Sequence, residues 1–371
     1  MSTFPRIGRV PLTTKQPEAC PHCGSHVLTR RGMRKKKLEI VQLWRCSSCK
    51  RVFTPGPTAL RNKTYPLRMI LSALTDYDTG HTLQETAARL KKKTNRSVSP
   101  STIATWLEQY KRHCSYRRFR AEGISRFPAN QTIRSIKLYH RQVYAYAYHR
   151  AKLDLLRDGT LDDKRTASAA STARFAPLAD FLESVPTVCP HELFTREEDV
   201  KARASQARPE FADASHAIVT RKENAATETA ALIIPAVGNN KLRHETLQRF
   251  MLANDSVTLA VEIPIWLSET DITAIEREYE IELAPKTTAP RVLTGHLDFL
   301  QVRNGAVHIL DYKPDAGTNK PIAQLTIYAL AVSRLTGIRL FDIKCAWFNE
   351  HEYCEFFPRK LLSRDRNQRA A

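Results

Sequence analysis

Residues 295–329, "GHLDFLQVRNGAVHILDYKPDAGTNKPIAQLTIYA", decide the fold. Two runs rich in apolar residues flank Asn304-Gly305, a pair that favours a two-residue hairpin turn because both positions accept positive φ. With this pair as the loop, the numbers of cross-strand partners sum to 609, so Asp298 is expected opposite Asp311. Side chains alternate along a strand, and Asp298, Asp311 and Lys313 therefore share one face of the predicted hairpin.

Two carboxylates that face each other directly repel. One salt bridge to Lys313 does not satisfy both acids among apolar neighbours, whereas a divalent cation held between them does. The pattern predicts a Mg²⁺ or Mn²⁺ site with a lysine beside it. The alternative is the solvent-facing side of an edge hairpin, on which the acids diverge, and the spacing alone leaves both interpretations open.

Composition indicates a globular protein with a basic N-terminal part. The chain has 371 residues, enough for two or three domains, and 42% of them are apolar. Residues 1–120 contain 25 Lys and Arg against 6 Asp and Glu, a net charge of +19, so the other 251 residues carry +1 of the total of +20. Such a local excess is typical of a phosphate-binding surface, although a solvated basic face has the same composition.

The chain shows neither a membrane-spanning nor an export pattern. No apolar run approaches the roughly 20 residues of a membrane helix, and the first 15 residues lack the apolar core of a signal peptide. We therefore expect a cytoplasmic protein that is associated with the nucleoid and has no membrane partner.

Four of the eight cysteines form two Cys-x-x-Cys knuckles in "CPHCGSHVLTRRGMRKKKLEIVQLWRCSSC". Each knuckle directs two sulfurs at one centre, so Cys20, Cys23, Cys46 and Cys49 are predicted to bind one structural Zn²⁺ tetrahedrally. A redox pair or iron is the alternative. The segment "MRKKK" at the turn of this ribbon predicts phosphate contacts by Arg34, Lys35, Lys36 and Lys37.

Three helical segments are predicted over residues 65–113. Gly80 ends the first, the second runs from Thr82 to about Lys93, and the third has Ser99 as N-cap with Pro100 at its first position. This arrangement fits a helix-turn-helix that presents Ser101, Thr102 and Thr105 to the major groove. The alternative is an ordinary small helical bundle.

Residues 20–112 resemble the N-terminal DNA-binding region of insertion-sequence transposases. The shared features are "CPHCGS", "RCSSCKRVFT" and a "G-x-T-x-x-E-x-A…S-x-S-T-I-x-x-W-L" run. The resemblance implies double-stranded DNA as a partner. Residues 121–230 carry no catalytic motif, and "TIRSIKLYHRQVYAYAYHRAKLDLL" within them is expected to form one long helix.

The C-terminal part, roughly residues 235–358, resembles the PD-(D/E)XK nuclease superfamily, and within it the RecB-type exonucleases and their CRISPR-adaptation relatives. Four segments match in order: "GNNKLRH" at 238–244, "GHLD" at 295–298, "ILDYK" at 309–313 and "QLTIY" at 324–328. The resemblance implies that His244, Asp298 and Asp311 are Mg²⁺ or Mn²⁺ ligands and that Lys313 is the catalytic lysine.

Three further residues have open roles. In this resemblance Gln324 positions water or phosphate, or merely caps a helix, and Tyr328 braces the site or only packs in the core. Glu262 in "VTLAVEIPIWL" is either a further ligand or an outer partner. No iron–sulfur cluster is expected, because Cys345 and Cys354 belong to a last hairpin, and the motifs do not fit a transposase core with three carboxylates.

Together these patterns predict a multidomain protein: a zinc ribbon (1–60), a helix-turn-helix domain (61–120), a helical connecting region (121–230) and an α/β restriction-endonuclease-like core with a mixed central sheet (231–371). The expected function is a metal-dependent DNA nuclease with a mobile-element or phage-related role, whose partners would include other transposition or defence proteins. The alternatives are a transcription regulator with an inactive nuclease fold and a DNA-repair exonuclease.

Overall fold

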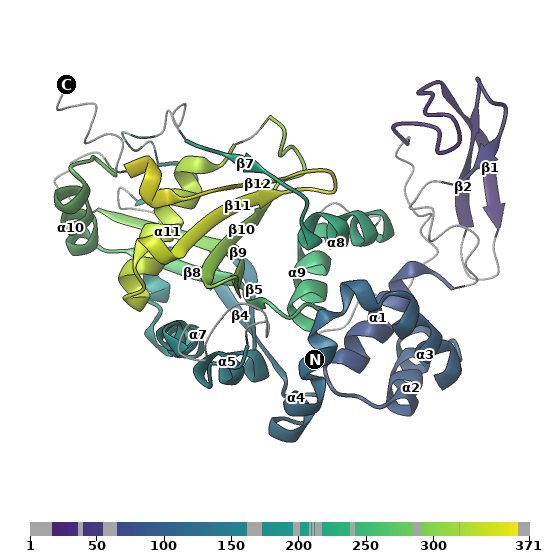
Figure 1. The fold of residues 1–371 in the computed structure, drawn as a ribbon, viewed down its shortest axis with the longest axis horizontal. Coiled ribbons are helices and arrows are strands. Elements are labelled where there is room, and N and C mark those ends of the chain that lie inside the picture. The colour runs from purple at the N-terminus through teal and green to yellow at the C-terminus, as the bar shows by residue number, and fades with distance from the viewer. Residues whose placement is uncertain are drawn as a thin grey trace.

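The computed structural model describes residues 17–35, 40–54, 65–161, 173–195, 201–207, 209, 211, 217–237, 242–284, 291–318 and 320–362. Lys36 and Lys37, two of the predicted phosphate contacts, lie outside the described residues, and only the backbone of Lys35 is described. Figure 1 shows a small ribbon sheet, a helical bundle next to it and one large sheet flanked by helices.

The ribbon is an antiparallel sheet of three strands, β1 (Leu28–Lys35), β2 (Ile40–Cys46) and β3 (Val52–Phe53). The strand predicted to return the second knuckle is confirmed as β2. Trp44, Leu28 and Phe53 form a small core that also contains Cys20 and Cys46. This core is small for an independent unit, and domains of this size usually need a metal or disulfide cross-link.

Three helices follow in the predicted places: α1 (Leu67–Asp78), α2 (Leu83–Thr94) and α3 (Pro100–Gln109). Thr82 and Glu85 form a capping box at the start of α2, and the Ser99 hydroxyl accepts the Thr102 N–H at the start of α3. The buried face of α3 and its C-cap consists of apolar and aromatic residues at helical spacing: Ile103, Trp106, Leu107 and Tyr110.

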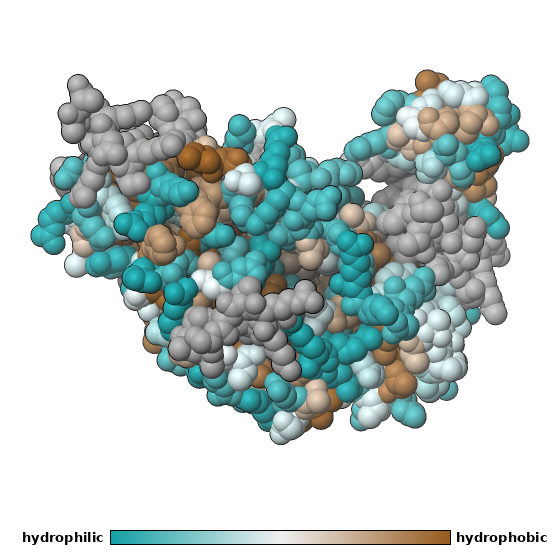
Figure 2. Space-filling model, in the orientation of Figure 1, coloured by the Kyte–Doolittle hydropathy of each residue, from teal (hydrophilic) through white to brown (hydrophobic). Residues whose placement is uncertain are grey.

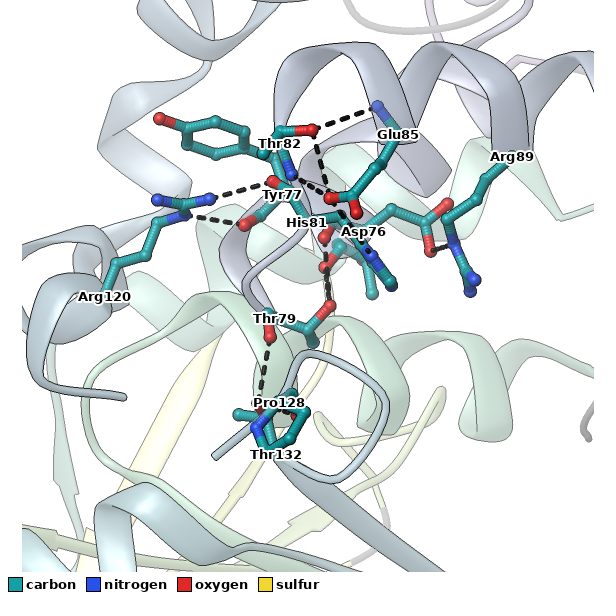
Figure 3. Close-up of polar contacts among 11 residues, drawn as sticks. Asp76, Tyr77, Thr79, His81, Thr82, Glu85, Arg89, Arg120, Pro128 and Thr132 are labelled. Atoms are coloured by element: carbon teal, nitrogen blue, oxygen red, sulfur yellow. Dashed lines mark hydrogen bonds and ion pairs between the residues drawn. The ribbon is translucent and has the colours of Figure 1, made fainter. Parts of the chain in front are cut away.

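The turn between α1 and α2 is tied to the chain that follows the bundle (Figure 3). Arg120 donates hydrogen bonds to the carbonyl oxygens of Tyr77 and His81, both at 2.8 Å, and the Thr132 hydroxyl donates to the Thr79 carbonyl at 2.9 Å. Helix α1 also packs on α9 (Arg243–Asn254) of the large domain. The bundle and the large sheet therefore share one continuous buried core.

Residues 133–149 correct the expectation of a helical middle region. They form a hairpin of β4 (Ile133–His140) and β5 (Gln142–His149), and only the last part of the expected helix is helical, as α5 (Arg150–Arg157). The reason lies in the tyrosines at 144, 146 and 148, which repeat every second residue, as strands require, and cannot share a helical face. Arg141, with φ of +58°, reverses the chain between the strands.

The large sheet has nine strands in the described part of the chain, in the order β4-β5-β8-β9-β10-β11-β12-β7, with β6 pairing with β9. The further strands are β6 (Lys201–Arg203), β7 (Thr220–Arg221), β8 (Thr258–Leu267), β9 (Val292–Arg303), β10 (Ala306–Tyr312), β11 (Ile343–Phe348) and β12 (Tyr353–Phe356). The sheet is mixed, since β10–β11 and β6–β9 are parallel. Four of its strands come from residues 121–230, so this region is an integral part of the sheet.

Helices cover both faces of this sheet. They are α7 (Ala176–Val188), α8 (Ala225–Ile233), α9, α10 (Glu269–Tyr279) and α11 (Ile322–Thr336). The short helix α4 (Arg120–Arg126) packs on α5. Helices α7 and α11 share one core cluster with the sheet, while α8, α9 and the bundle share the other (Figure 1). None of the described helices is long and apolar enough to cross a membrane. The surface in Figure 2 is mainly hydrophilic, with small separate hydrophobic patches.

Candidate active site

The hairpin of β9 and β10 has the predicted register. Asn304 and Gly305 form its turn with φ of +50° and +65°, and Val302 pairs with Val307. The pairing sum of 609 is kept as far as Leu310 and Phe299. One step further the strands separate, and the Tyr312 N–H donates to the Asp298 carboxylate at 3.0 Å instead of to the ladder.

A split in the sheet creates the space for a site. One edge of β9 pairs with β8 along most of its length, so β6 and β10 share the other edge. Strand β6 covers residues 292–294 of that edge and β10 covers residues 299–303, so no strand of the described part of the chain pairs with residues 295–298 there. Asp298 thus lies where the sheet opens.

A pocket with a volume of about 410 Å³ lies at this split. Glu262 lines this pocket, and so do all the residues predicted for the catalytic site: His244, Asp298, Asp311, Lys313, Gln324 and Tyr328. They come from α9, β9, the end of β10 and α11, elements spread over 85 residues of sequence. The structure therefore brings His244, Gln324 and Tyr328, which only the order of motifs had connected, to the acids and the lysine of the hairpin.

The two acids differ in their electrostatic environment. Burial and the charge of Asp298 raise the pKa of Asp311 to about 8. Burial also favours the neutral form of Asp298, but His244, Asp311 and the Tyr312 N–H outweigh it and hold the pKa of Asp298 below its ordinary value. The repulsion between the carboxyl groups is thus borne by Asp311, which keeps a proton at neutral pH in the absence of a cation.

Glu262 is a third acid of the site. The pairs Val261–Phe299 and Ile263–Leu297 on either side place it level with Asp298 on the neighbouring strand. Burial and the Asp298 charge raise the pKa of Glu262 to about 7. Its backbone has φ of +53°, a strained conformation for this residue in mid-strand, which typically persists where the site requires it.

His244 and Gln248 extend from α9 toward these acids. His244 Nδ1 lies 3.4 Å from Asp298 Oδ2, and the surrounding carboxylates outweigh burial and raise the pKa of His244. Gln248 Nε2 donates a hydrogen bond to the Glu262 carboxylate at 2.8 Å, and this bond holds the Glu262 side chain in place. The predicted helix position of His244 is confirmed, since it is the second residue of α9.

Lys313 lies directly beside Asp311. Its Nζ atom is 2.9 Å from Asp311 Oδ2, yet that buried oxygen accepts no well-aligned hydrogen bond from the described residues. Burial disfavours the ammonium, but Asp311 outweighs it and raises the pKa of Lys313, so the lysine is charged at neutral pH. Its main-chain N–H donates to the Phe348 carbonyl at 2.9 Å, which fixes the residue at the end of β10.

Gln324 and Tyr328 lie one turn apart on α11. The Gln324 amide donates to the Tyr328 hydroxyl at 2.8 Å, and Gln324 is not the cap of this helix, whose N-cap is Pro321. Tyr328 is 5% exposed, so most of its ring is core and its hydroxyl meets the pocket. A Cβ atom on Gly295 would approach Tyr328 Cε1 to 2.5 Å, so glycine is needed for the ring to lie over β9.

We expect Gly295→Ala to destabilise the protein by roughly 1–3 kcal/mol, because the added methyl group displaces a buried aromatic ring. Urea unfolding measures this loss. Gly317→Ala is the matched control, because its new Cβ meets only the end of the Glu352 side chain, at 2.9 Å. A Gly295→Ala protein as stable as the control would contradict this packing.

The residues of the pocket suit a divalent cation in part. Carboxylates are the ligands that Mg²⁺ and Mn²⁺ prefer, and the buried Asp311 oxygen without a hydrogen bond provides an acceptor. His244, Asp298 and Asp311 do not form a set whose donor atoms all lie within 4.8 Å of one another. A cation would therefore be held mainly by the acids, with water completing its shell, which is the usual arrangement for Mg²⁺.

The four ribbon cysteines, by contrast, are arranged for a metal ion. Their sulfur atoms all lie within 4.8 Å of one another, and two pairs, Cys20–Cys49 and Cys23–Cys46, are 3.6 Å apart. Tetrahedral zinc with bonds of about 2.3 Å separates its sulfurs by about 3.8 Å. The cluster could therefore hold a structural ion such as zinc.

The predicted DNA contacts of the bundle are placed on α3. Ser101 and Thr105 are exposed and Thr102 is half-buried. Their hydroxyls are engaged locally, since Thr102 contacts Ser99 at 2.8 Å and Thr105 donates to the Ser101 carbonyl at 3.0 Å. Arg34 in β1 is exposed.

Several pocket residues escaped the sequence analysis. Arg203, His140, Phe194 and His296 also line the pocket. Arg203, His140 and Phe194 come from residues 121–230, which were expected to form a helical connecting region, and the only available signal there was the alternation of residues 133–149. His296 belongs to the "GHLD" segment of the predicted hairpin, but the sequence analysis gave it no role. No protein-family model matches the chain, and no curated protein shows significant similarity to it.

Proposed function

We propose that this protein is a metal-dependent DNA nuclease of the PD-(D/E)XK type, with a zinc ribbon and a helix-turn-helix that hold the DNA. The observation that supports this most strongly is the placement of Lys313, 2.9 Å from the buried Asp311 and at the split of the sheet that also exposes Asp298. A purely structural ion pair has no need of two further acids at the same place.

The chemistry of phosphodiester hydrolysis explains these residue types. A bound cation would supply a water of lowered pKa and a positive charge for a phosphate oxygen. The water oxygen forms a bond to phosphorus, the bond to one bridging oxygen breaks, and the leaving oxygen gains a proton. Lys313 is placed to donate to the phosphate oxygen that gains negative charge, and donors of this kind contribute about 10²–10³ in rate.

Gln324 and the acids have complementary parts. The Gln324 amide gives one N–H to the Tyr328 hydroxyl, so its second N–H can donate to a phosphate oxygen and its carbonyl oxygen can accept from a water in the pocket. Asp298 is ionised at neutral pH, whereas Asp311 and Glu262 must release protons before they bind a cation. Cleavage in Mg²⁺ is therefore expected to rise between pH 6 and pH 8.

Incubation of the purified protein with linear and circular plasmid tests this proposal, in parallel with Mg²⁺, Mn²⁺ and EDTA. We expect cleavage with either cation and none with EDTA. Cleavage of the circular form indicates an endonuclease, and degradation of linear DNA alone indicates an exonuclease. Intact plasmid in every arm, with DNA still bound, would support a transcription regulator instead.

The basic residues of the N-terminal part are expected to dominate DNA affinity, because they carry nearly all of the net charge. Arg31→Gln together with Arg34→Gln, both exposed in β1, should weaken binding and reduce the slope of log K against log salt by about 2. The matched control is Arg277→Gln, an exposed arginine of α10. An equal loss of affinity in the control would contradict a localised binding surface.

A further inference from the structure

A second cluster of metal-binding side chains lies beside the pocket. His140 ends β4, while Cys189 and His191 follow α7, at the start of the short helix η4 (His191–Phe194). His140 Nε2 lies 2.8 Å from His191 Nδ1, and a ring nitrogen of each histidine and the Cys189 sulfur all lie within 4.8 Å of one another. Among the described residues, the ribbon cysteines are the other set with this property.

The donor set matches the preferences of zinc. Imidazole nitrogen and cysteine sulfur are the usual ligands of Zn²⁺, and a site with three protein ligands leaves a fourth position for water or another group. Bonds of about 2.0–2.1 Å would set the two nitrogens about 3.3 Å apart, so the rings need to separate by about half an ångström from their present contact.

His140 is held as metal-bound histidines usually are. Its other nitrogen, Nδ1, lies 2.9 Å from Nε2 of His296, so a cation on Nε2 leaves Nδ1–H to donate to His296. Phe194 stacks on the His140 ring with centroids 4.1 Å apart, and Tyr144 stacks on His296 at 3.5 Å. With an exposure of 2%, His140 has no freedom to turn away.

We propose that His140, Cys189 and His191 bind a second zinc ion, with His296 as the partner that orients His140. The ion would join the β4–β5 turn and the segment after α7 to β9 at His296, two residues before Asp298. It would thereby fix one wall of the pocket. This site is independent of the proposed nuclease activity.

The test is the zinc content of the full-length protein after incubation with excess Zn²⁺ and removal of the unbound metal. We expect two zinc ions per chain in the wild type. Cys189→Ala and His191→Gln should each retain one, and the double variant Cys20→Ala, Cys46→Ala should also retain one. Cys354→Ala, which alters another buried cysteine, is the control and should retain two.

Two further measurements keep the test decisive. Circular dichroism of each variant shows whether it is folded. If Cys189→Ala does not fold, His191→Gln still tests the site, because His191 is only half-buried and its substitution disturbs the core less. X-ray absorption at the zinc edge of the ribbon double variant should show nitrogen as well as sulfur ligands. One zinc per chain in the wild type, or two in folded Cys189→Ala and His191→Gln proteins, would overturn the proposal. Neither measurement involves DNA, so the result is independent of the plasmid assay.

Discussion

Asp311→Asn is expected to abolish DNA cleavage, by at least about 10³-fold, while DNA binding by the N-terminal part persists. Asparagine keeps the size of the side chain but removes the charge that a cation in the pocket requires. The rate is measured on a labelled duplex under single-turnover conditions, and binding by electrophoretic mobility shift. Asp315→Asn, an exposed acid four residues away, is the matched control and should cut at the wild-type rate.

The same substitution also changes how the stability of the metal-free protein depends on pH. The pKa of Asp311 is raised to about 8 in the folded state, so the folded protein holds a proton that the unfolded chain releases near pH 4. Stability conferred by this proton is present below pH 4 and is lost as the pH rises toward 8. Asp311→Asn should therefore flatten the pH dependence of urea unfolding between pH 4 and pH 8. An unchanged pH dependence would mean that the pKa of Asp311 is not raised in the folded protein.

Lys313→Gln is expected to lower the cleavage rate by a factor on the order of 100 or more while leaving cation binding nearly intact. Glutamine retains a donor of similar length but lacks the charge that stabilises the developing phosphate anion. Titration with Mn²⁺, followed by calorimetry, separates binding from chemistry. Lys320→Gln, exposed at the start of the α11 segment, is the control. A Lys313→Gln protein that cuts at the wild-type rate would remove the lysine from the mechanism.

The hairpin and the helix starts could be predicted because local chemistry determines them. Asn304-Gly305 fixes a two-residue turn, and this turn alone sets the register that brings Asp298 next to Asp311. The starts of α2 and α3 follow from Thr82 with Glu85 and from Ser99 with Pro100, each within one turn of the helix.

Long-range pairing could not be predicted in the same way. Strand β5 pairs with β8 more than a hundred residues later, and His140 meets His191 only because β4 joins the same sheet. The left-handed backbone of Glu262 is likewise absent from any local pattern, since a charged residue in an apolar strand does not by itself indicate positive φ. The tertiary context decides these features.

The sequence also predicts that the two carboxylates repel each other, but it does not show which of the two has its pKa raised. The hairpin register alone treats Asp298 and Asp311 alike. In the structure Asp298 has the Tyr312 N–H and His244 as partners. Asp311 is paired with Lys313 and lies against the charge of Asp298. The substitution that relieves the repulsion is therefore at Asp311, and residue spacing alone does not distinguish Asp311 from Asp298.

The most direct test of the nuclease assignment compares single-turnover cleavage by the wild type and by Asp311→Asn in Mn²⁺, at protein concentrations that saturate the DNA in both cases. The account predicts rapid cleavage by the wild type, and for Asp311→Asn a rate no higher than that of the wild type in EDTA. Equal cleavage by both proteins, or no cleavage by DNA-bound wild type in either Mn²⁺ or Mg²⁺, would contradict it.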